Sequence, residues 1–77
     1  MSLRQTFAAN LKRLRVAKGL SQEELAHRAD LDRTYISSLE RSVYAASLDT
    51  LERLAKELSV NPEELLARVS VRRPQKD

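Results

Sequence analysis

The sequence predicts an all-α fold, and three observations lead to that prediction. Only one of the 77 residues is glycine and two are proline, aromatic residues make up 4%, and Leu, Ala, Glu, Lys and Arg are abundant. This composition favours helix over sheet. Apolar residues recur at helical spacing, and residues that cap helices well stand before each such segment. We therefore expect five short helices around one small core.

The first helix is predicted over about residues 3–18. Ser2 with Gln5 three residues later can form a capping box, and Lys18-Gly19 is typical of a helix C-terminus. The inward positions are expected to be Phe7, Leu11 and Leu14.

The second and third helices are short and close together. Ser21 followed by Glu24 is a second capping box, and Asp30-Leu31 interrupts the apolar stripe after about two turns. Asp32 can cap the next helix, whose inward residues are expected to be Ile36 and Leu39. Two such helices joined by about three residues are a candidate helix-turn-helix.

The last two helices follow a loop at residues 42–46. Ser47 can cap a fourth helix, whose inward residues are expected to be Leu48, Leu51, Leu54, Ala55 and Leu58. Asn61-Pro62 is a good start for a fifth helix with an apolar face of Leu65, Leu66 and Val69. We expect one domain over residues 1–69 and a flexible basic tail over 70–77.

Composition limits the classes of function. Without cysteine there is no disulfide, thiolate metal site or cysteine nucleophile. The apolar runs are too short to span a bilayer, and the N-terminus lacks a signal segment, so a cytoplasmic protein without a membrane partner is expected. The net charge is +3, and the first 22 residues carry five basic residues and no acid. That asymmetry fits either a polyanion partner or a solvated basic face.

The third helix carries the candidate binding residues. With 100° per residue and Ile36 inward, its outward residues are Thr34, Ser37, Ser38 and Arg41. Arg33 lies in the first turn, where it could pair with guanine O6 and N7, and Tyr35 lies on the flank. We predict base readout by Arg33, Thr34, Ser37 and Ser38, and contacts to the DNA backbone from Gln22, Tyr35 and Arg41.

Three segments carry a family resemblance: Leu20-Ser21-Gln22-Glu23-Glu24-Leu25-Ala26, Tyr35-Ile36-Ser37 and Leu39-Glu40-Arg41. Over about residues 5–67 the chain resembles the Cro/C1-type (Xre family) helix-turn-helix domain. The resemblance implies that the second helix crosses the DNA backbone, that the third enters the major groove, and that a homodimer reads two half-sites one turn apart. It also implies a structural ion pair between Arg15 and Glu40.

A narrower resemblance and three departures accompany this one. Residues 31–37, LDRTYIS, also resemble controller proteins of restriction–modification systems, which are single-domain dimers of similar length. The departures are Asp30 and Ser42, where the family often has Gly, and Ala46, where it often has Pro. Asp tolerates the left-handed conformation moderately well, so the turn at Asp30 is expected to survive.

Other interpretations of single residues are simpler. His27 is the only histidine, and without a second His or a Cys it is expected to face solvent rather than bind metal. No serine is placed beside it, and no phosphate loop or carboxylate pair is present, so an enzyme, a cofactor and a small-molecule substrate are not expected. Leu65, Leu66 and Val69 either form a dimer interface or close the monomer core.

The sequence thus predicts a prokaryotic, sequence-specific transcriptional regulator that binds double-stranded DNA as a homodimer on a near-palindromic operator. Repression by occupying a promoter is the simplest mechanism, and activation through RNA polymerase stays open. The alternatives are the narrower role of restriction–modification controller, an antitoxin-like module that binds protein through the fifth helix or the tail, and a non-specific binder of nucleic acid or an anionic surface.

Overall fold

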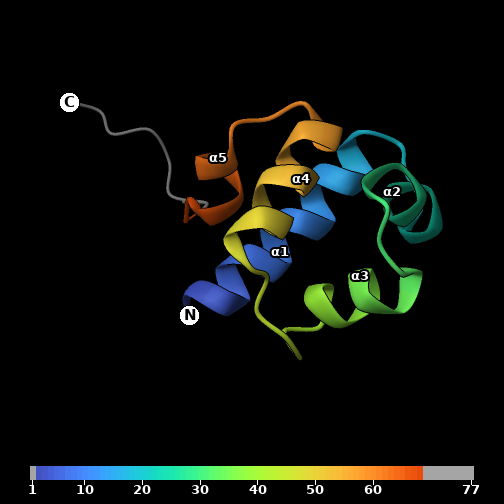
Figure 1. The fold of residues 1–77 in the computed structure, drawn as a ribbon. Coiled ribbons are helices and arrows are strands. Elements are labelled where there is room, and N and C mark those ends of the chain that lie inside the picture. Colours follow the sequence, from blue (N-terminus) through green and yellow to red (C-terminus); the bar gives the residue numbers. More distant parts are fainter. Residues whose placement is uncertain (1, 69–77) are drawn as a thin grey trace.

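Five α-helices follow one another along the chain in the computed structural model, which describes residues 2–68 (Figure 1). They are α1 (Leu3–Ala17), α2 (Gln22–Ala29), α3 (Arg33–Glu40), α4 (Leu48–Leu58) and α5 (Pro62–Leu66). The described residues contain no strand, and the predicted all-α class is confirmed. Val69 and the predicted tail at 70–77 lie outside the described residues.

The helices begin where their caps predict. The Ser2 hydroxyl accepts a hydrogen bond from the Gln5 amide at 3.1 Å, and the Gln5 side chain accepts one from the Ser2 amide at 2.9 Å. Ser21 and Glu24 form the same reciprocal pair at the start of α2. Each box satisfies two amides that the helix itself leaves without a partner.

The first four helices end at left-handed residues. Asp30 (φ 57°) and Ser59 (φ 60°) are the C-caps of α2 and α4, whereas Gly19 (φ 77°) and Ser42 (φ 62°) directly follow the C-caps of α1 and α3. Only Gly19 adopts this conformation without a steric penalty. Asp30 keeps the turn between α2 and α3, as expected from its tolerance of left-handed backbone.

The core takes side chains from every helix. Its fully buried large apolar members are Leu11, Leu25, Ile36, Leu39, Leu54 and Leu65. Through them α1 packs on α3 and α5, α2 packs on α3 and α4, and α4 packs on α5 (Figure 1). Within residues 2–68, most large aliphatic side chains belong to or pack against this core, and the exposed ones are Leu3, Val16, Val43 and Leu48.

The fifth helix is shorter than the sequence suggests and belongs to the monomer core. The Asn10 side chain, itself buried, donates to the carbonyls of Leu65 at 2.9 Å and Ala67 at 2.7 Å. These bonds satisfy carbonyls at the end of α5, and Ala67 leaves helical geometry (ψ 133°). Leu65 is 0% exposed, so its predicted place in a dimer interface is wrong. Its side chain closes the core of a single chain.

Leu48 is a second correction, because it was expected to face inward and is 80% exposed. It is the first residue of α4, and its side chain leans towards the helix N-terminus. No helix among residues 2–68 is long and apolar enough to cross a membrane.

Candidate nucleic-acid interface

The turn between α2 and α3 fixes the two helices relative to each other. After the left-handed Asp30, the Leu31 amide donates to the Ala26 carbonyl at 2.8 Å. The Asp32 carboxylate then accepts from the Thr34 amide at 2.9 Å and starts α3. Because three residues join the helices and two of them are tied by these bonds, the beginnings of α2 and α3 form one rigid unit.

A polar hollow of about 180 Å³ lies between the beginnings of these helices. It is lined by Gln22 from α2 and by Arg33, Thr34 and Ser37 from α3. Arg33 is exposed and makes no hydrogen bond or ion pair with any of residues 2–68 that would restrain its guanidinium. The hollow therefore brings together four of the predicted contact residues, which together offer a guanidinium, two hydroxyls and an amide.

A network of hydrogen bonds around the buried Arg15 side chain reaches this hollow. Arg15 of α1 pairs with Glu40 of α3 through Nε to Oε2 at 2.6 Å and a second guanidinium nitrogen to Oε1 at 3.1 Å. Arg15 also donates to the Leu20 carbonyl at 2.8 Å. Glu40 Oε1 accepts a further bond, 3.1 Å long, from the Gln22 side-chain amide. The ion pair thus extends to a residue that lines the hollow, a link that the sequence analysis did not anticipate.

Ser38 is not available at this site. It is 6% exposed, so its predicted role in base readout is wrong. The helical wheel used for the prediction placed Ile36 at the centre of the buried face of α3. In the structure Ile36 and Leu39 are both fully buried, so the centre of that face is shifted towards Leu39. Centring the wheel on Leu39 brings Ser38 to the edge of the buried face and leaves Thr34, Ser37 and Arg41 outward. The second inward apolar residue of α3, Leu39, was the signal in the sequence that could have corrected the orientation of this wheel.

The flank of α3 carries two further side chains at the surface. Arg41 is exposed, and its Nε donates to the Ser37 carbonyl at 3.3 Å. Tyr35 is half-buried and its ring packs on that of Tyr44, with centroids 6.4 Å apart and planes inclined by 40°. Tyr44 lies in the loop before α4 and was missed in the sequence, where that loop has no periodic pattern. Such a tilted arrangement is one that aromatic pairs prefer.

The start of α2 favours negative charge. The pKa of Glu24 lies below its usual value because the backbone and side chain of Ser21 hydrogen-bond its carboxylate. Gln22 sits in the same turn, next to amides at the positive end of the helix dipole. A phosphate oxygen is a suitable ligand for this position. His27, at the other end of α2, is exposed to solvent.

The chain is similar in sequence and in structure to known helix-turn-helix proteins. The family model described as Helix-turn-helix matches residues 11–65. Control protein C.BamHI of Bacillus amyloliquefaciens is 42% identical over 66 residues, which span 84% of this chain and 82% of that protein. The crystal structure of the hypothetical transcription factor NHTF from Neisseria matches with a TM-score of 0.84 and 43% identity, over 87% of this chain and 77% of that one. The restriction–modification controller protein C.AhdI from Aeromonas hydrophila matches with a TM-score of 0.78 and 44% identity, over 80% and 94%.

Proposed function

This chain belongs to the Cro/C1-type helix-turn-helix family of transcriptional regulators, and from that membership we propose that it binds a near-palindromic operator as a homodimer. In this proposal α3 enters the major groove and α2 crosses the backbone, which is the usual docking of this motif. Two copies then read two half-sites about one DNA turn apart. The chain acts in the cytoplasm, where its operator lies.

The observation that carries the proposal is the polar hollow shared by α2 and α3. Arg33 stands at its exposed edge without a competing partner in the described part of the chain, so it can pair with guanine O6 and N7. Thr34 and Ser37 can bond to neighbouring base edges. Gln22 is hydrogen-bonded to Glu40, and Arg41 lies on the flank of α3. Both are suited to phosphate contacts that set the register of the protein on the duplex.

The test is selection from a randomised duplex pool at near-physiological salt, followed by sequencing of the retained DNA and a mass measurement of the complex. We expect enrichment of a two-fold motif bound by two chains. Retention without a motif, and equal competition by unrelated DNA, would support the charge-only alternative instead. A motif bound by one chain would keep DNA recognition and remove the homodimer.

We further propose that the regulated genes are those of a restriction–modification system. Support comes from the relatives, because C.BamHI is named a control protein and C.AhdI a restriction–modification controller. The selected motif should then occur upstream of neighbouring endonuclease or methyltransferase genes. A reporter carrying that region should change its output when the chain is supplied, and the direction of the change separates repression from activation through RNA polymerase.

A further inference from the structure

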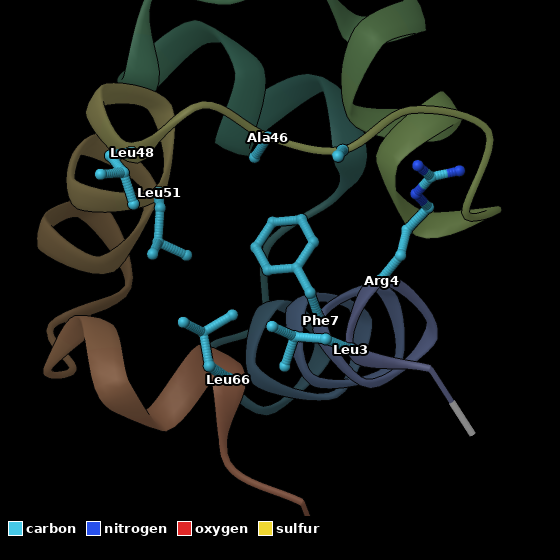
Figure 2. Close-up of a pocket in the computed structure, with 8 residues that line it drawn as sticks. Leu3, Arg4, Phe7, Ala46, Leu48, Leu51 and Leu66 are labelled. Carbon is cyan, nitrogen blue, oxygen red and sulfur yellow. The ribbon is translucent and has the colours of Figure 1, made fainter.

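A second polar surface lies just past the end of α3, where the loop at residues 41–47 meets the beginning of α1. Arg4 of α1 and Ala45 and Ala46 of the loop line one groove of about 310 Å³. Arg4 is the only charged residue among the described residues that line this groove. Figure 2 shows its side chain extending towards the loop and away from Leu66. The fold thus places a cation beside the segment that follows α3.

The loop returns along the flank of α3. It turns at the left-handed Ser42, and the Val43 amide donates to the Ser38 carbonyl at 2.9 Å. The Tyr44 ring then packs beside that of Tyr35, the third residue of α3, with centroids 6.4 Å apart. Tyr44 is nevertheless 56% exposed, and its hydroxyl has no hydrogen-bond partner within residues 2–68.

The surroundings of this surface are basic. Residues 2–22 contain no acid, and residues 41–47 contain Arg41 and no acid. The next acid along the chain, Asp49, lines a different hollow. Arg4 is exposed, and its guanidinium makes no hydrogen bond or ion pair within residues 2–68. An unpaired guanidinium and a free phenolic hydroxyl both donate hydrogen bonds, and together they suit a phosphate group.

The surface borders the reading face, which is the exposed side of α3 together with the start of α2. Arg33 and Ser37 line the hollow on one flank of α3. Tyr35 is two residues from each of them, and two residues turn an α-helix by about 200°. Tyr44 packs on Tyr35 and so lies on the flank away from the hollow. A helix about 10 Å in diameter nearly fills a major groove about 12 Å wide, so its two flanks face the two strands.

We propose that Arg4 and Tyr44 hold a backbone phosphate on the DNA strand opposite to the one that Gln22 contacts. This inference rests on the proposed DNA binding and adds two contact residues to it. Phosphate contacts on both flanks fix the position of α3 in the groove, and so decide which base edges Arg33 meets. Because such contacts carry no sequence information themselves, Arg4 and Tyr44 are positioning residues.

The first experiment measures how operator affinity depends on salt for Arg4→Gln and for Lys12→Gln. Each phosphate contact contributes about 0.9 to the slope of log K against log salt. Arg4→Gln removes one contact per chain, so the slope should become less steep by about 1.8 on an operator that holds two chains. Lys12 is exposed on the same helix, has no partner within residues 2–68 and does not line the groove. Its variant should keep the wild-type slope.

The two variants lose the same net charge, so their comparison separates a local contact from a general charge effect. Equal changes in both slopes, or an unchanged slope in Arg4→Gln, overturn the Arg4 contact. Circular dichroism checks that the helices are intact, and the mass of the complex gives the number of bound chains. A changed number of chains in Arg4→Gln would assign Arg4 to another surface and overturn the contact as well.

The second experiment removes only the hydroxyl of Tyr44. Tyr44→Phe keeps the ring that packs on Tyr35, and operator affinity should fall by about three- to tenfold. The salt slope and the preference among single-base variants should stay at wild-type values, because a neutral hydroxyl releases no counterion and a phosphate contact reads no base. Fluorescence anisotropy measures both. An unchanged affinity, or an altered base preference, overturns the phosphate contact of Tyr44.

A scan with methylphosphonates identifies the phosphate itself. Replacing one phosphate at a time by this neutral group should reveal one position per half-site at which the wild type loses affinity and Arg4→Gln loses little further. The same scan with Gln22→Ala should show its coupled position on the other strand. The absence of any position coupled to Arg4 overturns the contact, and coupling of both residues on one strand overturns the placement across the groove.

These measurements separate the inference from the proposed function. Unrelated duplex DNA is held through its phosphates, so there too the slope of Arg4→Gln should be less steep than that of Lys12→Gln. A wild-type chain without sequence preference would remove the specific operator, while the slopes on unrelated DNA would still decide the Arg4 contact. A specific operator that Arg4→Gln and Tyr44→Phe bind as the wild type does would overturn the contact and leave the proposed function standing.

Discussion

At the scale of single residues, the reading face combines side chains that have no partner within residues 2–68 with two side chains that contact other residues. Arg33 has no partner among residues 2–68, whereas Gln22 donates a hydrogen bond to Glu40 and the Tyr35 ring packs on that of Tyr44. Held side chains lose little conformational entropy on binding. We therefore expect register to come from the held residues and base preference to come mainly from Arg33.

Arg33→Ala should lower affinity for the selected operator by about 1–3 kcal/mol and relax the preference at one base pair. The reason is the loss of a bidentate contact to guanine. Fluorescence anisotropy with the operator and its single-base variants measures both effects. Arg28→Ala is the matched control, because it removes an exposed charge of α2 that does not line the hollow. Equal relaxation in the two variants would contradict the role given to Arg33.

Glu40→Ala should lower the free energy of unfolding by about 3–5 kcal/mol, because it leaves the Arg15 guanidinium buried without its carboxylate. The double variant Arg15→Met/Glu40→Leu should recover most of this loss, since apolar side chains of similar size can replace a buried ion pair. Urea unfolding measures both.

The same double variant tests the link to Gln22. With Glu40 gone, the Gln22 amide has no anchor, so operator affinity should fall although the fold is stable. Gln22→Ala should then cause little further loss in that background, whereas it should weaken binding in the wild type. Equal losses in both backgrounds would show that Glu40 does not position Gln22.

At the scale of helices and turns, local chemistry decided how much could be predicted. The starts of α1 and α2 follow from Ser-x-x-Gln and Ser-x-x-Glu, because capping boxes act within four residues. The end of α5 could not be predicted, because Asn10, more than 50 residues away in sequence, takes the terminal carbonyls. Leu65 was assigned to the wrong side for the same reason, because the packing of α5 on α1 and α4 joins residues far apart in the sequence. Periodicity finds an apolar face, but tertiary packing decides what covers it.

The two turns that follow α1 and α3 predict opposite effects of glycine. Ser42→Gly should stabilise the fold by about 0.5–1 kcal/mol, because the left-handed backbone strains serine. Gly19→Ala should destabilise it by about 1 kcal/mol, and for conformational reasons alone, since a Cβ there meets no atom within 4 Å. Thermal and urea unfolding check both signs. A destabilised Ser42→Gly variant would mean that the serine side chain contributes more than its backbone strain.

The capping box of α2 predicts a dependence of stability on pH. Because folding lowers the pKa of Glu24, its contribution to stability is present above the unfolded pKa and is lost as pH falls through the folded pKa. The free energy of unfolding should therefore decrease between pH 5 and the lower acid range. Glu24→Gln keeps the hydrogen-bond acceptor and removes the titration, so it should flatten this part of the profile. An unchanged profile would assign the acid sensitivity to other carboxyl groups.

At the scale of the whole molecule, the chain divides its surface between two tasks. In our proposal the hollow of α2 and α3 presents donors to DNA, and a surface outside that hollow joins the two copies of the homodimer. Sequence reasoning located the first surface because its residues lie on one short helix and at the start of the helix before it. It placed Leu65 in a surface between two copies, whereas the fold buries this side chain in the core of one chain, because tertiary packing decides what covers an apolar face.

If the two copies of the proposed homodimer are joined rigidly, the distance between their α3 helices is fixed, and the operator must match it. Half-sites one turn apart, about 34–36 Å, should therefore bind two chains cooperatively. Inserting five base pairs turns one half-site to the opposite side of the duplex, so only one copy can engage, and operator affinity should fall at least tenfold. Electrophoretic mobility shifts on the two duplexes distinguish these cases, and a wild-type protein indifferent to spacing would argue that its copies bind DNA independently.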